Sequence, residues 1–406
     1  MPSTLPDGEP APADGRLPEA ALASAGAQPF GVYVHVPFCA SRCGYCDFNT
    51  YTATELGAGA SQDEYAATAA RELDLAAEVL GGRPGAQTVF FGGGTPTLLP
   101  VSDLVGLLRR IDGVLGLAPG AEVTAEANPE SVTPESLGAL RAGGFTRISF
   151  GMQSARRHVL AVLDRTHSPG RAQAAVAEAR AAGFDHVNVD LIYGTPGESD
   201  ADWRASLEAA VDTGADHVSA YSLIVEPGTR LAARVSRGEL ADPDDDVLAD
   251  RYLIAEEILS AAGFAWYEVS NWARSPAARS RHNVLYWTGA NWWGIGPGAH
   301  SHVGGVRWWN VKHPRDYAAR LAASRSPAAA REILTAEDKR VERILLGVRL
   351  REGLPTSELD DAAREAASRA ADDGLVDAAA LARGRVVLSV RGRLLADSVV
   401  RDMVGS

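Results

Sequence analysis

The stretch "HVPFCASRCGYCDFNT" (35–50) contains every cysteine of a chain of 406 residues, namely Cys39, Cys43 and Cys46. It continues "FGVYVHV" (30–36), which is short, β-branched and apolar, as is typical of a buried strand. The three thiols therefore lie in the loop that leaves this strand. They are too close together for a disulfide framework, which favours a reducing compartment such as the cytoplasm.

Beyond this loop, predicted strands alternate with predicted helices. Such alternation indicates an α/β fold with a parallel sheet and right-handed crossovers, in which ligands bind at the carboxyl ends of the strands. The predicted strands cover 30–36, 87–91, 121–128, 147–152, 186–194 and 217–224, and the predicted helices cover 62–80, 102–115, 133–142, 155–163, 169–182 and 200–213.

Polar and glycine-rich motifs follow the predicted strands at this same edge. Because the carboxyl ends of parallel strands meet, we expect these motifs to surround one site. They are the cysteine loop, "GGGTP" (92–96), "EANP" (126–129), "GMQS" (151–154) and "DLIYG" (190–194).

The composition divides the remainder of the chain. Residues 1–28, rich in Pro, Ala, Gly and acids, are predicted to be a disordered lead-in to the alternating region, 29–230. Residues 231–334 read as a connecting region rich in Trp, Gly and His. Residues 335–406 suggest two helices, with the second at 356–374, and an apolar hairpin over 385–400, as in a winged-helix-like α+β domain.

Charge and hydropathy exclude several classes of partner. The net charge is −13 and the pI is near 5.2, which argues against general affinity for nucleic acid or for anionic lipid. No apolar run approaches the ~20 residues of a membrane-spanning helix. We therefore expect a cytoplasmic protein whose contact with membranes, if any, is transient.

The cysteine spacing C-x3-C-x2-C permits three kinds of chemistry. Soft thiolates select zinc, copper(I) or iron–sulfur clusters. A [4Fe–4S] cluster usually takes four cysteines, so a cluster held by three leaves one iron open to another ligand. A Cys3His zinc site with His35 and a set of ordinary buried thiols are the alternatives.

The cysteine loop after the first strand and "GGGTP" after the second together resemble the radical SAM enzymes. The resemblance implies a partial (βα)6 barrel and a [4Fe–4S] cluster on Cys39, Cys43 and Cys46, with S-adenosylmethionine on the open iron. Each polar candidate, taken singly, could instead be an ordinary hydrogen-bonded or capping group. The residues that the resemblance assigns to the S-adenosylmethionine site are Tyr33, Tyr45, Gly93, Gly94, Thr95, Glu126, Gln153, Arg165 and Asp190.

Residues 30 to about 400 look more specifically like the oxygen-independent coproporphyrinogen III oxidase group. Phe48 stands where the decarboxylases of this group carry a further cysteine, and the first 28 residues bear no likeness to their N-terminal segment. The motif "HNVLYW" (282–287) instead matches the HNxxYW signature of a heme chaperone branch. That branch implies heme binding and delivery to acceptor hemoproteins such as respiratory cytochromes. The alternative is a coproporphyrinogen III dehydrogenase.

The same resemblance makes His282 the expected axial ligand of heme iron, a common role for a neutral imidazole. His300 and His302 are rival ligands, and His300 is alternatively part of the S-adenosylmethionine site. The plain alternative is that the His-Asn pair caps a helix and buries aromatic rings. The expected flat surface for the macrocycle comprises Tyr286, Trp287, Trp292 and Trp293.

Overall fold

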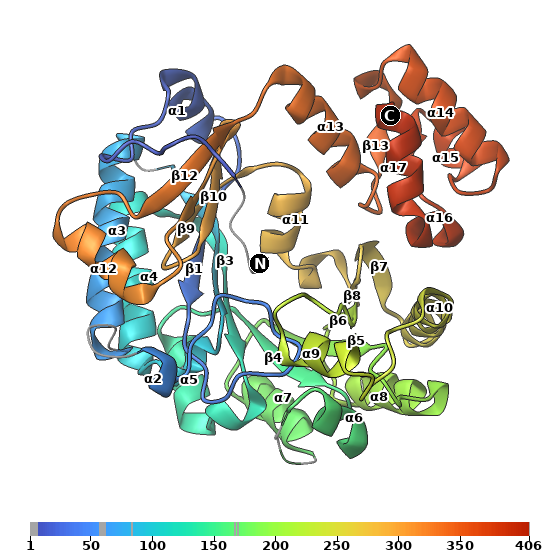
Figure 1. Cartoon of the computed structure of the whole chain (residues 1–406), viewed down its shortest axis with the longest axis horizontal. Helices are drawn as coiled ribbons and strands as arrows, with labels where there is room; N and C mark the ends of the chain where they lie inside the picture. Colours follow the sequence, from blue (N-terminus) through green and yellow to red (C-terminus); the bar gives the residue numbers. More distant parts are fainter. Residues whose placement is uncertain (1–6, 57–61, 83, 166–167, 169, 406) are drawn as a thin grey trace.

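The computed structural model describes residues 7–56, 62–82, 84–165, 168 and 170–405, and its centre is a parallel sheet (Figure 1). The six central strands are neighbours in chain order and pair in parallel, as the sequence predicts. These strands are β1 (Phe30–Val36), β2 (Ala86–Gly93), β3 (Leu117–Ala127), β4 (Arg147–Gln153), β5 (His186–Tyr193) and β6 (His217–Ser222).

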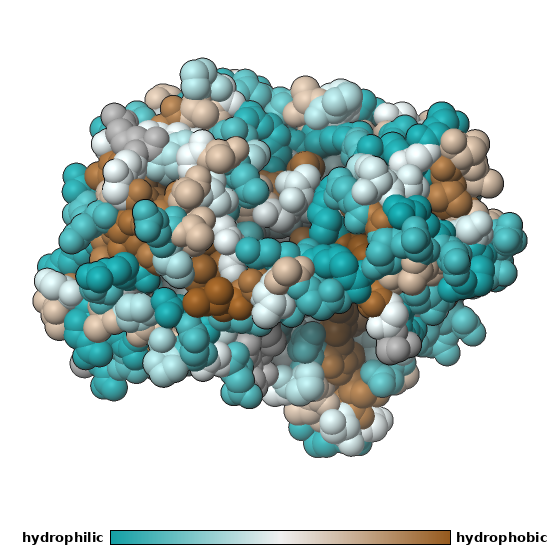
Figure 2. Space-filling model, turned by 90° about the horizontal axis from the view of Figure 1, so that it is seen from above, coloured by the Kyte–Doolittle hydropathy of each residue, from teal (hydrophilic) through white to brown (hydrophobic). Residues whose placement is uncertain are grey.

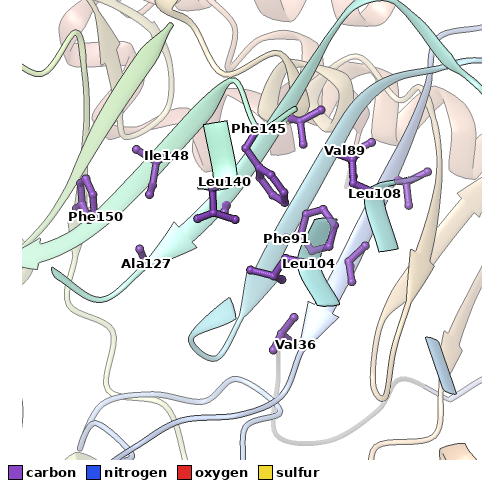
Figure 3. Packing of buried hydrophobic residues seen from close by; sticks show 14 of the residues in the cluster. Val36, Val89, Phe91, Leu104, Leu108, Ala127, Leu140, Phe145, Ile148 and Phe150 are labelled. Carbon is purple, nitrogen blue, oxygen red and sulfur yellow. The ribbon is translucent and has the colours of Figure 1, made fainter. Parts of the chain in front are cut away.

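Helices cover one face of this sheet and form the main core with it. Phe91 of β2 points from the sheet toward Phe145 and Leu104, and all three side chains are excluded from water (Figure 3). Because side chains alternate along a strand, Phe90 points to the opposite, barrel-interior face. The helices between the central strands are α2 (Ala53–Leu56), α3 (Gln62–Leu80), α4 (Val101–Leu115), α5 (Pro134–Ala142), α6 (Arg157–Val162), α7 (Arg171–Ala181) and α8 (Asp200–Asp212).

Residues 231–334 are not simply a connection, because their strands extend the same sheet at both edges. Strand β9 pairs in parallel with β1, and β8 pairs antiparallel with β6. These strands have only three to six residues each, too short to give a clear sequence signal. The elements are α9 (Arg230–Ser236), α10 (Asp245–Ala261), β7 (Ala265–Glu268), β8 (Asn271–Ala273), α11 (Arg281–Trp287), β9 (Asn291–Ile295), β10 (His300–Val303), β11 (Val306–Asn310), α12 (Pro314–Ala322) and β12 (Ala328–Ile333). In the described part of the chain the complete sheet has 12 strands.

The prediction of a disordered lead-in is wrong for residues 7–28. Helix α1 (Glu19–Ala25) buries Ala21 and Ala25, and a Cβ on Gly304 would lie 2.5 Å from the Cα of Ala21. The small residues that suggested disorder therefore allow a close approach between α1 and the turn after β10. Backbone pairing of Glu9 with Arg331 holds the segment before α1. Residues 1–6 lie outside the described part.

The C-terminal unit packs around a hydrophobic cluster of its own, separate from the main core. The predicted hairpin over 385–400 is wrong. Only Arg385 and Val386 are in a strand, and Val399, Val400 and Met403 are buried at helical spacing. The unit comprises α13 (Ala336–Gly347), β13 (Leu354–Pro355), α14 (Asp361–Asp372), α15 (Ala378–Ala382), β14 (Arg385–Val386), α16 (Val390–Leu394) and α17 (Ala396–Val404).

The molecular surface has no single continuous apolar area on the face drawn in Figure 2. That face is mostly hydrophilic, and its hydrophobic side chains form separate patches between hydrophilic ones. Four short 3-10 helices among the described residues complete the elements, at Pro96–Leu98, Pro129–Ser131, Pro276–Ala278 and Thr356–Glu358. No helix in the described part combines the length and the apolar composition needed to cross a membrane.

A buried carboxylate connects the added strands to α3. Glu72 accepts hydrogen bonds from the backbone N–H of Gly296 at 2.8 Å, from the Nδ2 atom of Asn310 at 2.8 Å and from the hydroxyl of Tyr317 at 2.5 Å. Burial raises the pKa of Glu72 to about 7, while these hydrogen bonds oppose the rise. The group is therefore protonated more readily in the folded chain than in the unfolded chain.

This carboxyl predicts a pH dependence of stability. Between about pH 5 and 7 the folded chain binds more protons than the unfolded chain, so the contribution of Glu72 to the free energy of unfolding falls as the pH rises. Urea unfolding of the wild type and of Glu72→Gln at pH 5, 6, 7 and 8 measures it. We expect a shallower decline in the variant and no change of slope in Glu64→Gln, an exposed position on the same helix. Equal slopes for the wild type and Glu72→Gln would contradict the assignment.

Candidate functional site

The cysteine loop leaves β1 at the carboxyl edge of the sheet and is held by backbone hydrogen bonds to three other segments. The N–H of Cys39 donates to the carbonyl of Tyr51 at 3.0 Å. The N–H of Gly44 donates to the carbonyl of Leu163 at 3.3 Å, and its own carbonyl accepts from Leu231 at 2.8 Å. The loop is therefore fixed by contacts after α6 and at the start of α9.

The three thiols are partly buried and influence one another. Burial, together with the smaller effects of the neighbouring Cys46 and Cys43, raises the pKa of Cys39 to about 11. Burial also raises the pKa of Cys46. Thiolates at these positions need a compensating cation, and a bound metal centre is such a cation.

No three histidine, cysteine or acidic side chains of the described residues are close enough together to hold a single metal ion. The thiols share one loop, and in a [4Fe–4S] cluster each cysteine binds a different iron. Three soft thiolates on one loop are therefore chemically suited to a centre that contains several metal ions. His35, the fourth ligand considered for zinc, is engaged at both ring nitrogens, by Tyr33 at 3.0 Å and the carbonyl of Asn49 at 2.9 Å.

The glycine-rich loop after β2 lies directly against the start of the cysteine loop. The N–H of Gly94 donates to the carbonyl of Val36 at 2.8 Å, and that of Thr95 donates to the carbonyl of Phe38 at 2.7 Å. A Cβ on Gly94 would overlap the carbonyl of Phe38, and one on Gly93 would lie 2.6 Å from the ring of His35. Glycines here allow two backbones to meet.

Glu126, at the end of β3, joins this contact from the barrel interior. Its Oε2 atom accepts a hydrogen bond from the N–H of Gly93 at 3.1 Å. Its removal from bulk water raises the pKa of Glu126 to about 8, and the nearby charge of Asp190 adds to the rise. The structure thus brings together the predicted residues Gly93, Glu126 and Asp190.

Arg165 connects the cysteine loop to β4. Its Nη1 atom donates to the Sγ atom of Cys43 at 3.4 Å, and its Nη2 atom donates to the carbonyl of Gly151 at 2.8 Å. The buried Nε atom of Arg165 has no partner among the described residues. This guanidinium places positive charge beside the thiol of Cys43 and keeps one donor for a ligand.

Gln153 holds a strained backbone at the end of β4. Its φ is 64°, in the left-handed region that costs a residue with a Cβ about 1–2 kcal/mol. A Cβ on Gly151 would lie 2.6 Å from the Nη2 atom of Arg165 and 2.8 Å from the Nε2 atom of Gln153. Such strain is typical of ligand-binding positions, and Gly151 is the small residue that accommodates both side chains.

Asp190 on β5 is supported by residues that the sequence did not single out. Its carboxylate accepts from the hydroxyl of Ser149 at 2.7 Å and from the Nδ2 atom of Asn188 at 2.8 Å. Strand pairing aligns Glu126, Ser149, Asn188 and His217 in one row across four strands. The only sequence signal for this row was the alternation of polar residues along each strand.

The two predicted aromatic contacts have different surroundings. Tyr33 on β1 stacks on Phe90 with ring centroids 6.2 Å apart, on the interior face near Glu126. Tyr45, between Cys43 and Cys46, packs beside the buried group of Val159, Leu163 and Ile192. Tyr33 is therefore located for a ligand inside the barrel, while much of Tyr45 serves packing of the cysteine loop.

His282 lies in the first turn of α11 and is buried in the barrel interior, not at a surface open to a macrocycle. Its Nδ1 atom pairs with the hydroxyl of Thr88 at 2.8 Å and its Nε2 atom with the hydroxyl of Tyr286 at 2.8 Å. Its backbone N–H donates to the Oε1 atom of Glu122 at 3.1 Å. With both ring nitrogens engaged, His282 cannot ligate iron unless Tyr286 moves away.

The four aromatic residues expected beneath a macrocycle do not share a surface. Tyr286 and Trp292 pack edge to face with ring centroids 4.6 Å apart, while Trp293 packs against Trp308. Adjacent residues of a strand point to opposite faces, which separates Trp292 from Trp293. Trp287 lies beside Glu268. The expectation of one flat apolar surface is wrong.

The rival histidines differ in availability. His302 is nearly buried, with Nδ1 paired with the carbonyl of Ala290 at 2.9 Å and Nε2 accepting from the N–H of Gly305 at 3.2 Å. The imidazole of His300 has no hydrogen-bond partner in the described part of the chain, and it stacks on Trp309 with ring centroids 5.9 Å apart. It also lies close enough to His35 to affect the pKa of that ring, near the cysteine-loop edge. Of the three, His300 is the most available ligand.

The chain is similar to a known protein family and to several named proteins. A family model described as the radical SAM superfamily matches residues 33–210. A protein named heme chaperone HemW from Mycobacterium tuberculosis is 58% identical over 384 residues, covering 95% of this chain and 97% of that protein. Another HemW, from Bacillus subtilis, is 32% identical and covers 92% of this chain and 98% of its own length.

A solved structure has the same fold over nearly the whole chain. Coproporphyrinogen III oxidase (HemN) from Escherichia coli, described as a radical SAM enzyme, superposes with a TM-score of 0.80 and covers 96% of this chain and 94% of its own. The two sequences are 21% identical, so this likeness concerns the fold alone. It confirms the radical SAM barrel followed by a C-terminal domain.

The contact between the glycine loop and the cysteine loop predicts the effect of a single methyl group. Gly94→Ala places a Cβ on the carbonyl of Phe38 and should displace the loop that carries Cys39. After anaerobic reconstitution we expect less than half of the wild-type iron and sulfide per chain, at unchanged helix content. Gly113→Ala is the matched control, because a Cβ at that helical position meets nothing within 4 Å. Full iron content in Gly94→Ala would contradict the role of the contact.

Proposed function

The chain belongs to the HemW family of the radical SAM superfamily, and on this premise we propose that it is a heme chaperone. It would bind heme, a [4Fe–4S] cluster and S-adenosylmethionine, and deliver heme to acceptor hemoproteins such as respiratory cytochromes. The observation that carries the proposal is the 58% identity to a HemW along 95% of the chain. The location we propose is the cytoplasm, where three reduced thiols would persist.

The residues at the strand ends support the cofactor part of this proposal. Cys39, Cys43 and Cys46 would hold the cluster, which when bound supplies one iron open to the amino and carboxylate groups of S-adenosylmethionine. Arg165 donates to the sulfur of Cys43 and would stabilise thiolate charge. Its unpartnered Nε atom is a suitable donor for a carboxylate.

Other residues would orient the adenosyl ligand. Glu126 fixes the N–H of Gly93 and has carboxylate capacity left for an ammonium group. Asp190 and Gln153 lie at neighbouring strand ends, and their side chains suit ribose hydroxyl groups. Gly93 and Gly94, lacking Cβ atoms, leave the backbone open to close approach.

Phe48 is one of the two departures that favour a chaperone over a dehydrogenase, the other being the N-terminal segment. Phe48, two residues after Cys46, is 43% exposed and can neither ligate metal nor transfer a proton. A decarboxylase that uses a cysteine at this point would therefore lose that group here. We retain coproporphyrinogen III dehydrogenase as the second candidate because the fold matches the E. coli oxidase over nearly its full length.

The two candidates predict different outcomes for one anaerobic experiment. The reconstituted protein is offered heme and, separately, coproporphyrinogen III with S-adenosylmethionine and a reductant. A chaperone should take up heme and transfer it to an apo-cytochrome without forming protoporphyrinogen. Protoporphyrinogen formation with consumption of S-adenosylmethionine would instead establish the dehydrogenase. Cys43→Ala is the cluster-deficient control and should contain less than half of the wild-type iron.

The identity of the heme ligand needs a separate experiment, because His282 of the HNxxYW motif is less accessible than His300. His282→Ala should retain a heme Soret band like that of the wild type, since both nitrogens of His282 already have partners. His300→Ala should shift that band or weaken heme binding by about tenfold if His300 is the axial ligand. The opposite pattern would restore His282 as the ligand and require Tyr286 to swing away.

A further inference from the structure

A cavity lies in the C-terminal unit, where the turn before β13 meets α15 and β14. Its volume is about 450 Å³, within the range of small-molecule sites. Its lining comprises Arg351, Glu352, Ala380, Arg383, Arg385 and Val387. None of these residues belongs to the cluster or S-adenosylmethionine site described above.

Three of the residues around the cavity are arginines, although the chain as a whole is acidic, and the lining surface itself is mostly apolar. Its one acid, Glu352, is already paired with Arg279 at 2.6 Å. Within the described residues, Arg351, Arg383 and Arg385 form no ion pair, and the guanidinium of Arg383 makes no hydrogen bond either. The guanidinium of Arg351 donates to the carbonyl of Trp266 at 3.4 Å, and that of Arg385 donates to the carbonyls of Glu352 and Gly353. Three arginines thus border the cavity without a carboxylate paired to any of them, and each has further N–H donors.

The walls of the cavity are held in place by backbone contacts. The side-chain Nη2 atom of Arg385 donates to the carbonyl of Gly353 at 2.9 Å, and the backbone N–H of Arg351 donates to the carbonyl of Tyr267 in β7 at 2.8 Å. Gly353 has a φ of 65°, and a Cβ there would overlap the carbonyl of Val386. The cavity is therefore attached to the barrel sheet and its shape does not depend on a free loop.

These groups match one kind of ligand chemistry. Guanidinium groups bind carboxylates or phosphates through paired, directional hydrogen bonds. Val387 and Ala380 add apolar surface beside them. The cavity therefore suits an anionic group carried on an apolar body.

The barrel interior offers the opposite chemistry. Glu126, Asp190 and Glu268 face it, and Arg165 there donates to Cys43 and Gly151 and keeps only its Nε atom without a partner among the described residues. The barrel interior therefore offers few hydrogen-bond donors to a carboxylate ligand. A heme chaperone must bind a macrocycle whose only strongly charged substituents are two propionates.

We propose that the cavity lined by Arg351, Arg383 and Arg385 binds the propionate groups of heme, on the C-terminal unit and away from the barrel interior. The proposal rests on the proposed heme-chaperone function and assigns a site to it. It requires no covalent step. The iron would be ligated separately, or carried without a strong protein ligand during transfer.

The test uses the full-length reconstituted protein and three tetrapyrroles. They are heme, iron-free protoporphyrin IX, which keeps both carboxylates, and heme dimethyl ester, in which both are blocked. The variants are Arg351→Glu/Arg383→Glu and the matched control Arg401→Glu, an exposed position of the same unit outside the cavity. Iron content and helix content, expected to equal those of the wild type, show that each variant is folded.

We expect the double variant to bind heme and protoporphyrin IX at least about tenfold more weakly than the wild type. Its affinity for the dimethyl ester should stay within about twofold of the wild-type value, and Arg401→Glu should change neither. Unchanged heme affinity in the double variant, or an equal loss for the ester, would overturn the cavity assignment while the chaperone function stands. A wild type that binds no heme would overturn both.

Discussion

The backbone contact between the glycine loop and the cysteine loop is the constraint on which the rest of the site depends. The carbonyls of Val36 and Phe38 accept from Gly94 and Thr95, so the first two βα turns are joined through main-chain atoms. This approach is possible only because positions 93 and 94 lack a Cβ. Two other ligand candidates are attached to this contact. Glu126 binds the N–H of Gly93 on one side, and Arg165 binds the sulfur of Cys43 on the other.

The HNxxYW motif has a structural role in this architecture, besides the heme-binding role that the sequence predicts. Its residues occur in two i, i+4 pairs on α11, which place side chains on common faces of the helix. His282 and Tyr286 bind each other and lie against β2, while Asn283 and Trp287 lie beside Glu268 of β7. The motif thus spans from one wall of the open barrel to the other. Closure of the barrel explains these residue types without heme.

The separation of the two proposed sites has a physical basis. The strand ends combine soft thiolates, buried acids and one arginine, a set suited to a cluster and a zwitterionic adenosyl ligand. The C-terminal cavity combines arginines with small apolar residues, a set suited to a dianionic macrocycle. A chaperone that released heme from the second site would not have to open the first.

Much of the fold and of the site could be predicted from the sequence, because the local patterns of apolar and polar residues agree with the overall fold. Strand 30–36 and helix 62–80 have the predicted bounds, and the motifs at the strand ends meet as expected. The failures have definite causes. Short strands such as Asn271–Ala273 carry too few residues for a period, and α1 is built from small residues that resemble a linker. The partners of His282 come from distant parts of the chain, so no local pattern could reveal that both its nitrogens are engaged.

The central claim is that three thiolates from one loop leave a single iron of a cluster free for the amino group of S-adenosylmethionine. The most direct measurement is electron–nuclear double resonance on the reduced, reconstituted protein with S-adenosylmethionine labelled with ¹⁵N at that amino group. The account predicts a ¹⁵N coupling that appears on addition of the labelled compound and is absent from Cys43→Ala. A fully loaded cluster that shows no such coupling, with a spectrum unchanged by the ligand, would contradict it.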